Sequence, residues 1–184
     1  MRRPARSTVE VLAAVLLPAA VTLALYWYGL SRTPDYLSSL FGRRDGDAND
    51  LKALLGTALL GMAVLQLLLA LWLYRRLPGA GPAPRPVPVL HRIGGLLAFL
   101  LSLPITYHCV TAYGVQLTGT RVAVHSVTGC VLYGAFVAKV VVVRSRRLPG
   151  WTLPTVGGLL VAAIALLWYS AALWQLNGQH LPGL

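Results

Sequence analysis

Five apolar segments, each long enough to cross a bilayer, constrain this chain more than any other feature. They run over about residues 9–30, 51–74, 91–115, 121–143 and 153–176. A helix needs about 20 mainly apolar residues to span the hydrocarbon core. Because backbone polar groups in lipid must be satisfied internally, each segment is expected to be an α-helix. The sequence therefore predicts an all-α fold, a single membrane domain over residues 1–184 built as a bundle of five transmembrane helices.

The composition leaves little room for a soluble domain. Hydrophobic residues make up 57% of the chain and charged residues 11%, and the mean hydropathy is +0.67. A soluble domain of this size would show amphipathic stripes rather than long uninterrupted apolar blocks. The connections are too short to carry an active site by themselves. We therefore expect any chemistry in the bundle or at its two mouths.

The positions of the basic residues predict the orientation. Cytoplasmic connections of membrane proteins carry an excess of Lys and Arg. The N-terminus, the second connection and the fourth connection hold eleven of the sixteen: Arg2, Arg3, Arg6, Arg75, Arg76, Arg85, Arg92, Lys139, Arg144, Arg146 and Arg147. The N-terminus is therefore expected in the cytoplasm and the C-terminus outside. The net charge of +11 then reflects topology and contact with anionic lipid head groups, and no nucleic acid is expected as a partner.

Two connections have distinctive compositions. Leu77–Pro88 is rich in Pro and Gly, which predicts an extended, solvated linker between a two-helix part and a three-helix part. The connection 31–50 ends in the acidic run Asp45-Gly46-Asp47-Ala48-Asn49-Asp50. This run lacks the spacing and the terminal Glu of an EF-hand, so we expect a solvated turn rather than a calcium site.

Two histidines are expected at matching depth on consecutive antiparallel segments. His108 lies near the end of the third segment and His125 just inside the fourth, with only a short turn at about 114–120 between them. With a rise of about 1.5 Å per residue, their depths agree within about one helical turn. Two imidazoles that face each other across a bundle interior are what axial ligation of a b-type haem requires. We expect one haem b toward the external half, the alternative being two hydrogen-bonded core histidines.

The neighbours of His125 add candidate contacts. Gly129, one turn further along the same face, would let a flat macrocycle approach the backbone, although close helix packing explains it equally well. Arg121, at the external mouth, is placed to pair with a haem propionate or to snorkel to water. Lys139 continues the same helical face.

The remaining histidines and the cysteines are less specific. His91 lies 17 residues before His108, about 25 Å along one helix, so it cannot share that haem. It is a candidate for a quinone hydrogen bond, a proton relay or a helix cap. Cys109 and Cys130 are expected to behave as small hydrophobes, with a disulfide left open. Copper is disfavoured because the adjacent His108 and Cys109 point about 100° apart. His180 is expected to be a solvated tail residue.

These motifs also resemble a known group of proteins. The stretches are His91-Arg92-x-Gly94-Gly95, Pro104-x-x-x-His108-Cys109 and Arg121-x-x-x-His125. Residues 91 to 174 resemble small bacterial integral membrane proteins of unassigned function and, more distantly, the cytochrome b and ferric-reductase-like transmembrane superfamily. The resemblance implies a bacterial cell membrane location, His108 and His125 as haem ligands, and Arg121 and Lys139 as propionate or quinone contacts. Many members of the superfamily stack two haems, whereas the fourth segment here holds only His125.

The expected function is that of a haem-containing electron-transfer subunit of a membrane oxidoreductase rather than a stand-alone enzyme. It would exchange single electrons with a separate redox protein, such as an iron–sulfur protein, or with quinone. Besides the lipid, a second copy of the chain stays open as a partner. The alternative is a non-redox accessory subunit or a small transporter without haem, which would be colourless.

Overall fold

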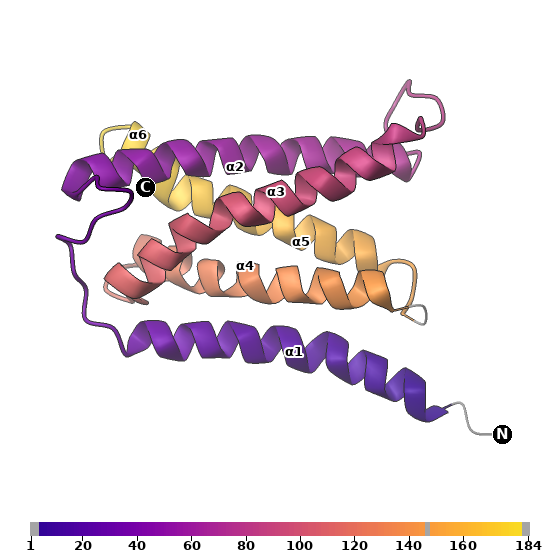
Figure 1. The fold of residues 1–184 in the computed structure, drawn as a ribbon, viewed down its shortest axis with the longest axis horizontal. Coiled ribbons are helices and arrows are strands. Elements are labelled where there is room, and N and C mark those ends of the chain that lie inside the picture. Colours follow the sequence, from indigo (N-terminus) through magenta and orange to yellow (C-terminus); the bar gives the residue numbers. More distant parts are fainter. Residues whose placement is uncertain (1–3, 146–147, 182–184) are drawn as a thin grey trace.

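The computed structural model describes residues 4–145 and 148–181, and this part of the chain is all-helical (Figure 1). A single β-bridge between Leu40 and Arg43 is its one extended pairing. The long helices are α1 (Pro4–Leu30), α2 (Asp45–Leu73), α3 (Pro86–His108), α4 (Thr120–Arg144) and α5 (Thr152–Leu167). With their short continuations they form five spans that are long and apolar enough to cross a membrane, which confirms the predicted five-helix fold.

Two predicted boundaries are wrong. The acidic run expected as a solvated turn forms the first turn of α2. The carboxylates of Asp45 and Asp47 interact favourably there with the positive end of the helix dipole. The extended linker expected as far as Pro88 ends earlier, since α3 begins at Pro86. Proline is tolerated in the first turn of a helix because the backbone N–H that it lacks has no intrahelical partner there.

Two segments of π-helix lie at one end of the bundle. The segment η1 (Cys109–Tyr113) continues α3, and η2 (Trp168–Leu173) continues α5 into the short α6 (Trp174–Leu176). We call this the histidine end, because His108 directly precedes η1 and α4 starts there; the opposite end, which carries the α2–α3 connection, is the linker end (Figure 1). The π-helix is rare and is found frequently at functional sites.

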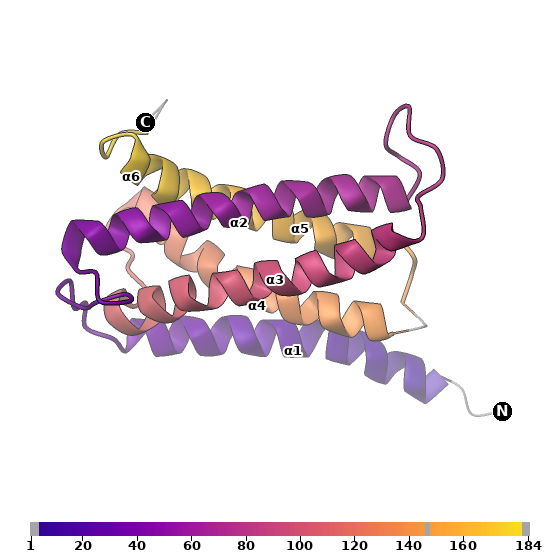
Figure 2. The ribbon, with the colours of Figure 1, turned by 45° about the horizontal axis from the view of Figure 1, so that its top comes forward.

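The packing order of the helices differs from their order in the chain. α1 packs along α4, α4 on α5, α5 and η2 on α2, and α2 on α3. Although a short turn joins α3 to α4, these two are not among the closely packed pairs. Nor do α1 and α2 pack on each other, and both views place them on opposite sides of the bundle (Figure 1 and Figure 2). The two-helix and three-helix parts predicted from the linker therefore interleave.

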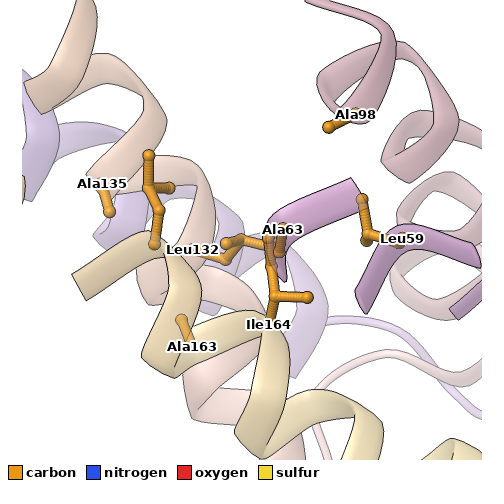
Figure 3. Packing of buried hydrophobic residues seen from close by; sticks show 8 residues of the cluster. Leu59, Ala63, Ala98, Leu132, Ala135, Ala163 and Ile164 are labelled. Atoms are coloured by element: carbon orange, nitrogen blue, oxygen red, sulfur yellow. The ribbon is translucent and has the colours of Figure 1, made fainter. Parts of the chain in front are cut away.

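Apolar residues, half of them alanine, form the centre of the bundle (Figure 3). Helices α2, α3, α4 and α5 contribute the buried cluster Leu59, Ala63, Ala98, Leu132, Ala135, Leu160, Ala163 and Ile164. Small side chains let membrane helices approach closely and gain dispersion contacts. Three aromatic rings line the interval between α3 and α4, with Phe99 5.1 Å from Phe136 and 6.2 Å from Tyr133 between centroids. The Tyr133 hydroxyl lies 2.9 Å from Ser102 Oγ, which ties the two helices together.

Helix α1 is attached through glycines. A methyl group at Gly134 of α4 would lie 2.8 Å from the Pro18 carbonyl oxygen, so the absence of a side chain permits this crossing. At the histidine end, the Val115 N–H donates to the Gly29 carbonyl at 3.0 Å. Gly114 has φ +68°, a conformation that favours glycine. These contacts fix the end of η1 against the end of α1.

Candidate functional site

His108 ends α3 and is buried, with 4% of its surface exposed. Its Nε2 lies 3.2 Å from Ser38 Oγ, and its ring meets the edge of Tyr113 at 5.3 Å between centroids. The Ser38 hydroxyl donates its single proton to the Asp35 carbonyl at 2.9 Å. Ser38 Oγ therefore accepts from Nε2–H, so the lone pair of the neutral ring is on Nδ1. That nitrogen is buried and has no hydrogen-bond partner.

His125 in α4 is held in the same way by a different segment. Its Nδ1 lies 3.1 Å from Ser170 Oγ in η2. The Ser170 hydroxyl donates to the Leu166 carbonyl at 2.7 Å, so its oxygen accepts from Nδ1–H. The lone pair of this ring is therefore on Nε2. Each imidazole donates one hydrogen bond to a serine whose own hydroxyl proton is bonded to a carbonyl, and each keeps one nitrogen able to bind a metal. A hydrogen bond from the other ring nitrogen is what orients histidine ligands in metalloproteins.

Two cations flank the histidines. Arg121 Nη1 donates to the Ser170 carbonyl at 2.8 Å, and its guanidinium lies 3.9 Å from the centroid of the Trp174 ring. Lys52 of α2 places its ammonium 4.1 Å from the centroid of the Tyr113 ring, close enough for its charge to act on both imidazoles. Neither cation forms an ion pair with a carboxylate of the described residues. An anionic group at this end would therefore find two unpaired positive charges.

Two cavities open at the histidine end. One of about 290 Å³ is lined by Ser38, Pro104, Tyr107, His108 and Thr111, together with their neighbours in the α1–α2 connection. The other, of about 170 Å³, is lined by Arg121, Trp174, Gln179, His180 and Leu181. His180, expected as a solvated tail residue, is exposed as predicted but shares this cavity with Arg121.

The predicted site residues divide between the two ends of the bundle. At the histidine end, Arg121 and His125 both hydrogen-bond Ser170, whereas His108 hydrogen-bonds Ser38. Gly129 faces α5, because a Cβ there would lie 4.0 Å from Leu167 Cδ2, so its position favours the helix-packing interpretation. His91 and Lys139 lie toward the linker end, far along the helices from the other candidates.

The donor set at the histidine end is restricted. Cys109 and Cys130 carry free thiols. Within residues 4–145 and 148–181, no cluster of three or more His, Cys, Asp or Glu side chains is placed to hold a metal ion. Two imidazoles alone make a poor site for a bare ion, but they suffice for haem iron, whose other four ligands belong to the macrocycle.

Sequence reasoning missed the residues that hold the histidines. Ser38 and Ser170 lie 70 and 45 residues from their partners. Lys52, which lies in α2 within the predicted segment 51–74, was not recognised as a site residue. The one available signal was indirect, since a buried imidazole requires a hydrogen-bond partner.

Residues 11–183 match the model of a family of unknown function (DUF6529), and the chain belongs to that family. No curated protein and no solved structure matches the chain.

Proposed function

We propose that this protein is a haem b-binding electron-transfer subunit of a bacterial cell membrane, with His108 and His125 as the axial ligands. The proposed topology places the N-terminus in the cytoplasm, following the distribution of Lys and Arg, so that the histidine end faces outward. One observation carries the proposal. Each imidazole donates a proton to a serine whose own proton is committed to a backbone carbonyl, and each keeps one nitrogen lone pair free for iron.

Three further features fit a haem. His108 Nδ1 is a buried polar atom without a partner, which costs free energy unless something binds it. Ligand-bearing helices must stand apart to admit two imidazoles and an iron between them, and α3 and α4 are not closely packed. Lys52 and Arg121 supply positive charge for two propionates. The distant sequence resemblance to the cytochrome b superfamily points the same way.

His108 and His125 would hold the haem, which would supply one-electron transfer. The protein does the rest. Ser38 and Ser170 fix the tautomer and orientation of each ring, since each hydroxyl is itself fixed by a carbonyl. The rings of Phe99, Tyr133 and Phe136 contact one another in the interval between α3 and α4 and would limit the entry of water there. The proposed partner is a separate redox protein, such as an iron–sulfur protein, or a quinone.

The test is a visible spectrum of the protein purified in mild detergent after expression with ample haem. We expect a Soret band and a sharp α-band in the dithionite-reduced wild type. Both bands should be lost in His108→Ala and in His125→Ala. His180→Ala, which removes an exposed imidazole at the same end, is the matched control and should keep the full spectrum. A colourless wild type would refute the proposal.

A second candidate function rests on a specific observation. His125 and Arg121 both bind Ser170, one through the hydroxyl and the other through the carbonyl. These bonds join α4 to η2 without any cofactor, as expected of a structural or accessory membrane subunit. In that case His125→Ala would lower the stability of the protein, and the wild type would be colourless.

A further inference from the structure

A second group of polar side chains lies in the half of the bundle nearer the linker end. Gln66 of α2 is buried, with 8% of its surface exposed, and its Oε1 has no hydrogen-bond partner. A lone amide oxygen inside a membrane-length apolar helix is costly to bury because neither water nor lipid satisfies it. This oxygen is an acceptor that requires a donor.

Two further helices bring side chains to this amide. The imidazole of His91 in α3 lies beside the backbone of Gln66, and its Nδ1 is also buried without a partner. The ammonium of Lys139 in α4 is close enough for its charge to act on His91. Among the described residues no carboxylate pairs with Lys139. An acceptor, an imidazole nitrogen and an unpaired cation thus lie in the same region of three helices.

Gly94 and Gly95 make the room for this group. A Cβ at Gly94 would collide with Gln66 Nε2, and one at Gly95 would lie 3.5 Å from Oε1. The two glycines of the His91-Arg92-x-Gly94-Gly95 motif therefore accommodate the amide of Gln66. An alanine at Gly94 would displace the amide of Gln66.

The unpartnered atoms define the ligand that would complement them. An ionised carboxylate would satisfy Lys139 but offers no proton to Gln66 Oε1. A quinone accepts hydrogen bonds from Lys139, and its hydroquinone form also donates one to Gln66. The entry route suits an apolar molecule, because α3 and α4 are not closely packed and the side chains of Ile93, Leu96 and Val143 on these helices are exposed apolar surface.

We infer that Gln66, His91 and Lys139 form a binding site for the head group of a membrane-soluble hydroquinone or quinone. The hydroquinone hydroxyl donates to Gln66 Oε1, and an oxygen of the ring accepts from the Lys139 ammonium. His91 Nδ1 completes the hydrogen bonding. The binding site is inferred independently of haem. Only the role of the bound molecule as the electron-transfer partner rests on the proposed function.

The test measures binding of a radiolabelled benzohydroquinone with a ten-carbon tail to the full-length protein in nanodiscs, by equilibrium dialysis under argon. We expect saturable binding of one molecule per chain. Affinity should fall at least about tenfold, the effect of losing one such hydrogen bond, in Gln66→Leu, His91→Phe and Lys139→Met. Arg92→Gln is the matched control, because it removes an exposed cation beside His91, and it should bind like the wild type.

Gln66→Glu is a second variant at the same position, in case Gln66→Leu fails to fold. At a pH where the introduced glutamate is ionised, its carboxylate still offers an acceptor oxygen. Gln66→Glu should therefore retain hydroquinone binding when Gln66→Leu does not. Non-saturable uptake by the wild type, or equal affinity in all variants, overturns the inference. The visible spectrum separates this result from the fate of the haem. A red protein that does not bind the hydroquinone refutes the second site alone, and a colourless protein that binds it refutes the haem alone.

Discussion

Gly114 is the residue at which the fold and the candidate site are most directly coupled. It follows η1 with φ +68°, and a Cβ there would lie 2.5 Å from the Gly29 carbonyl oxygen and 3.0 Å from Arg32 Cβ. With ψ −164°, this backbone conformation is one that essentially glycine alone adopts, and it costs an L-residue about 1–3 kcal/mol. Overpacking adds about 1–3 kcal/mol. We therefore expect Gly114→Ala to lower the free energy of unfolding by about 2–6 kcal/mol, which is a factor of about 30 to 20,000 in the unfolding equilibrium.

The same substitution should disturb the site. The residues of η1 lie between His108 and Gly114, and the Asp35 N–H donates to the Ala112 carbonyl at 2.6 Å. Asp35 in turn accepts the hydroxyl proton of Ser38, the residue that holds His108. Displacing η1 from α1 therefore displaces both the ring and its serine. We expect Gly114→Ala to lose haem faster than the wild type does.

Unfolding is measured by titration with sodium dodecyl sulfate in mixed micelles, and haem loss by transfer to apomyoglobin. Gly119→Ala is the matched control, because this glycine belongs to the same turn, has an extended φ of −163° and has no atom within 4 Å of a Cβ. It should change the free energy of unfolding by less than about 0.5 kcal/mol, as surface substitutions usually do. Equal stability of the two variants would refute the reasoning.

Three further changes test individual contacts. Ser170→Ala removes the acceptor of His125 Nδ1–H and should weaken haem binding by about 10–100-fold, measured as the rate of haem loss, with Ser31→Ala unaffected. Lys52→Met removes a cation near both imidazoles. A nearby positive charge favours the reduced haem over the oxidised haem, so the midpoint potential should fall in a potentiometric titration. An unchanged potential would place Lys52 away from the iron. Tyr133→Phe deletes the hydrogen bond to Ser102 and should cost about 0.5–1.5 kcal/mol of unfolding free energy while leaving the haem spectrum intact, whereas a lost spectrum would show that Tyr133 acts on the haem.

The sequence was sufficient for the number and class of the helices but not for their arrangement. Long apolar segments must form helices in lipid, so the five spans follow from hydropathy alone. Which helices pack together depends on the shape of their surfaces. Gly134 allows α1 to lie on α4, a contact that no spacing in either segment predicts. The linker suggested two separate parts, yet α2 packs on both α3 and α5.

Helix boundaries were missed where local rules compete. Pro86 and Pro88 suggested an extended linker, but the first turn of a helix accepts proline. The π-helical segments η1 and η2 have no composition that distinguishes them from α-helix. They depend on how each helix end fits against its neighbours, as the contact of η1 with α1 shows.

Of the candidate site, the sequence predicted the histidines but not the residues that orient them. Depth along a helix follows from residue counting, so His108 and His125 were placed at the same end. Rotation about the helix axis and the identity of the facing segment are tertiary properties. Ser38 comes from a connection and Ser170 from a π-helical segment, and only the folded chain brings them to the rings.

That two unrelated segments supply the same support is the strongest argument for a ligand at the histidine end. A histidine kept only for packing gains most when both ring nitrogens are satisfied, because each unsatisfied buried atom is costly. Here both serines already donate their proton to a carbonyl, so each ring keeps one nitrogen lone pair. In His108 this lone pair is on Nδ1, which has no hydrogen-bond partner among the described residues. The same reasoning applied to Gln66 Oε1 at the other end requires a donor instead of a metal. Both unsatisfied atoms carry lone pairs, but an imidazole nitrogen is a ligand for iron whereas an amide oxygen is chiefly a hydrogen-bond acceptor, and they lie at opposite ends of the bundle, which is why we assign them to two different ligands.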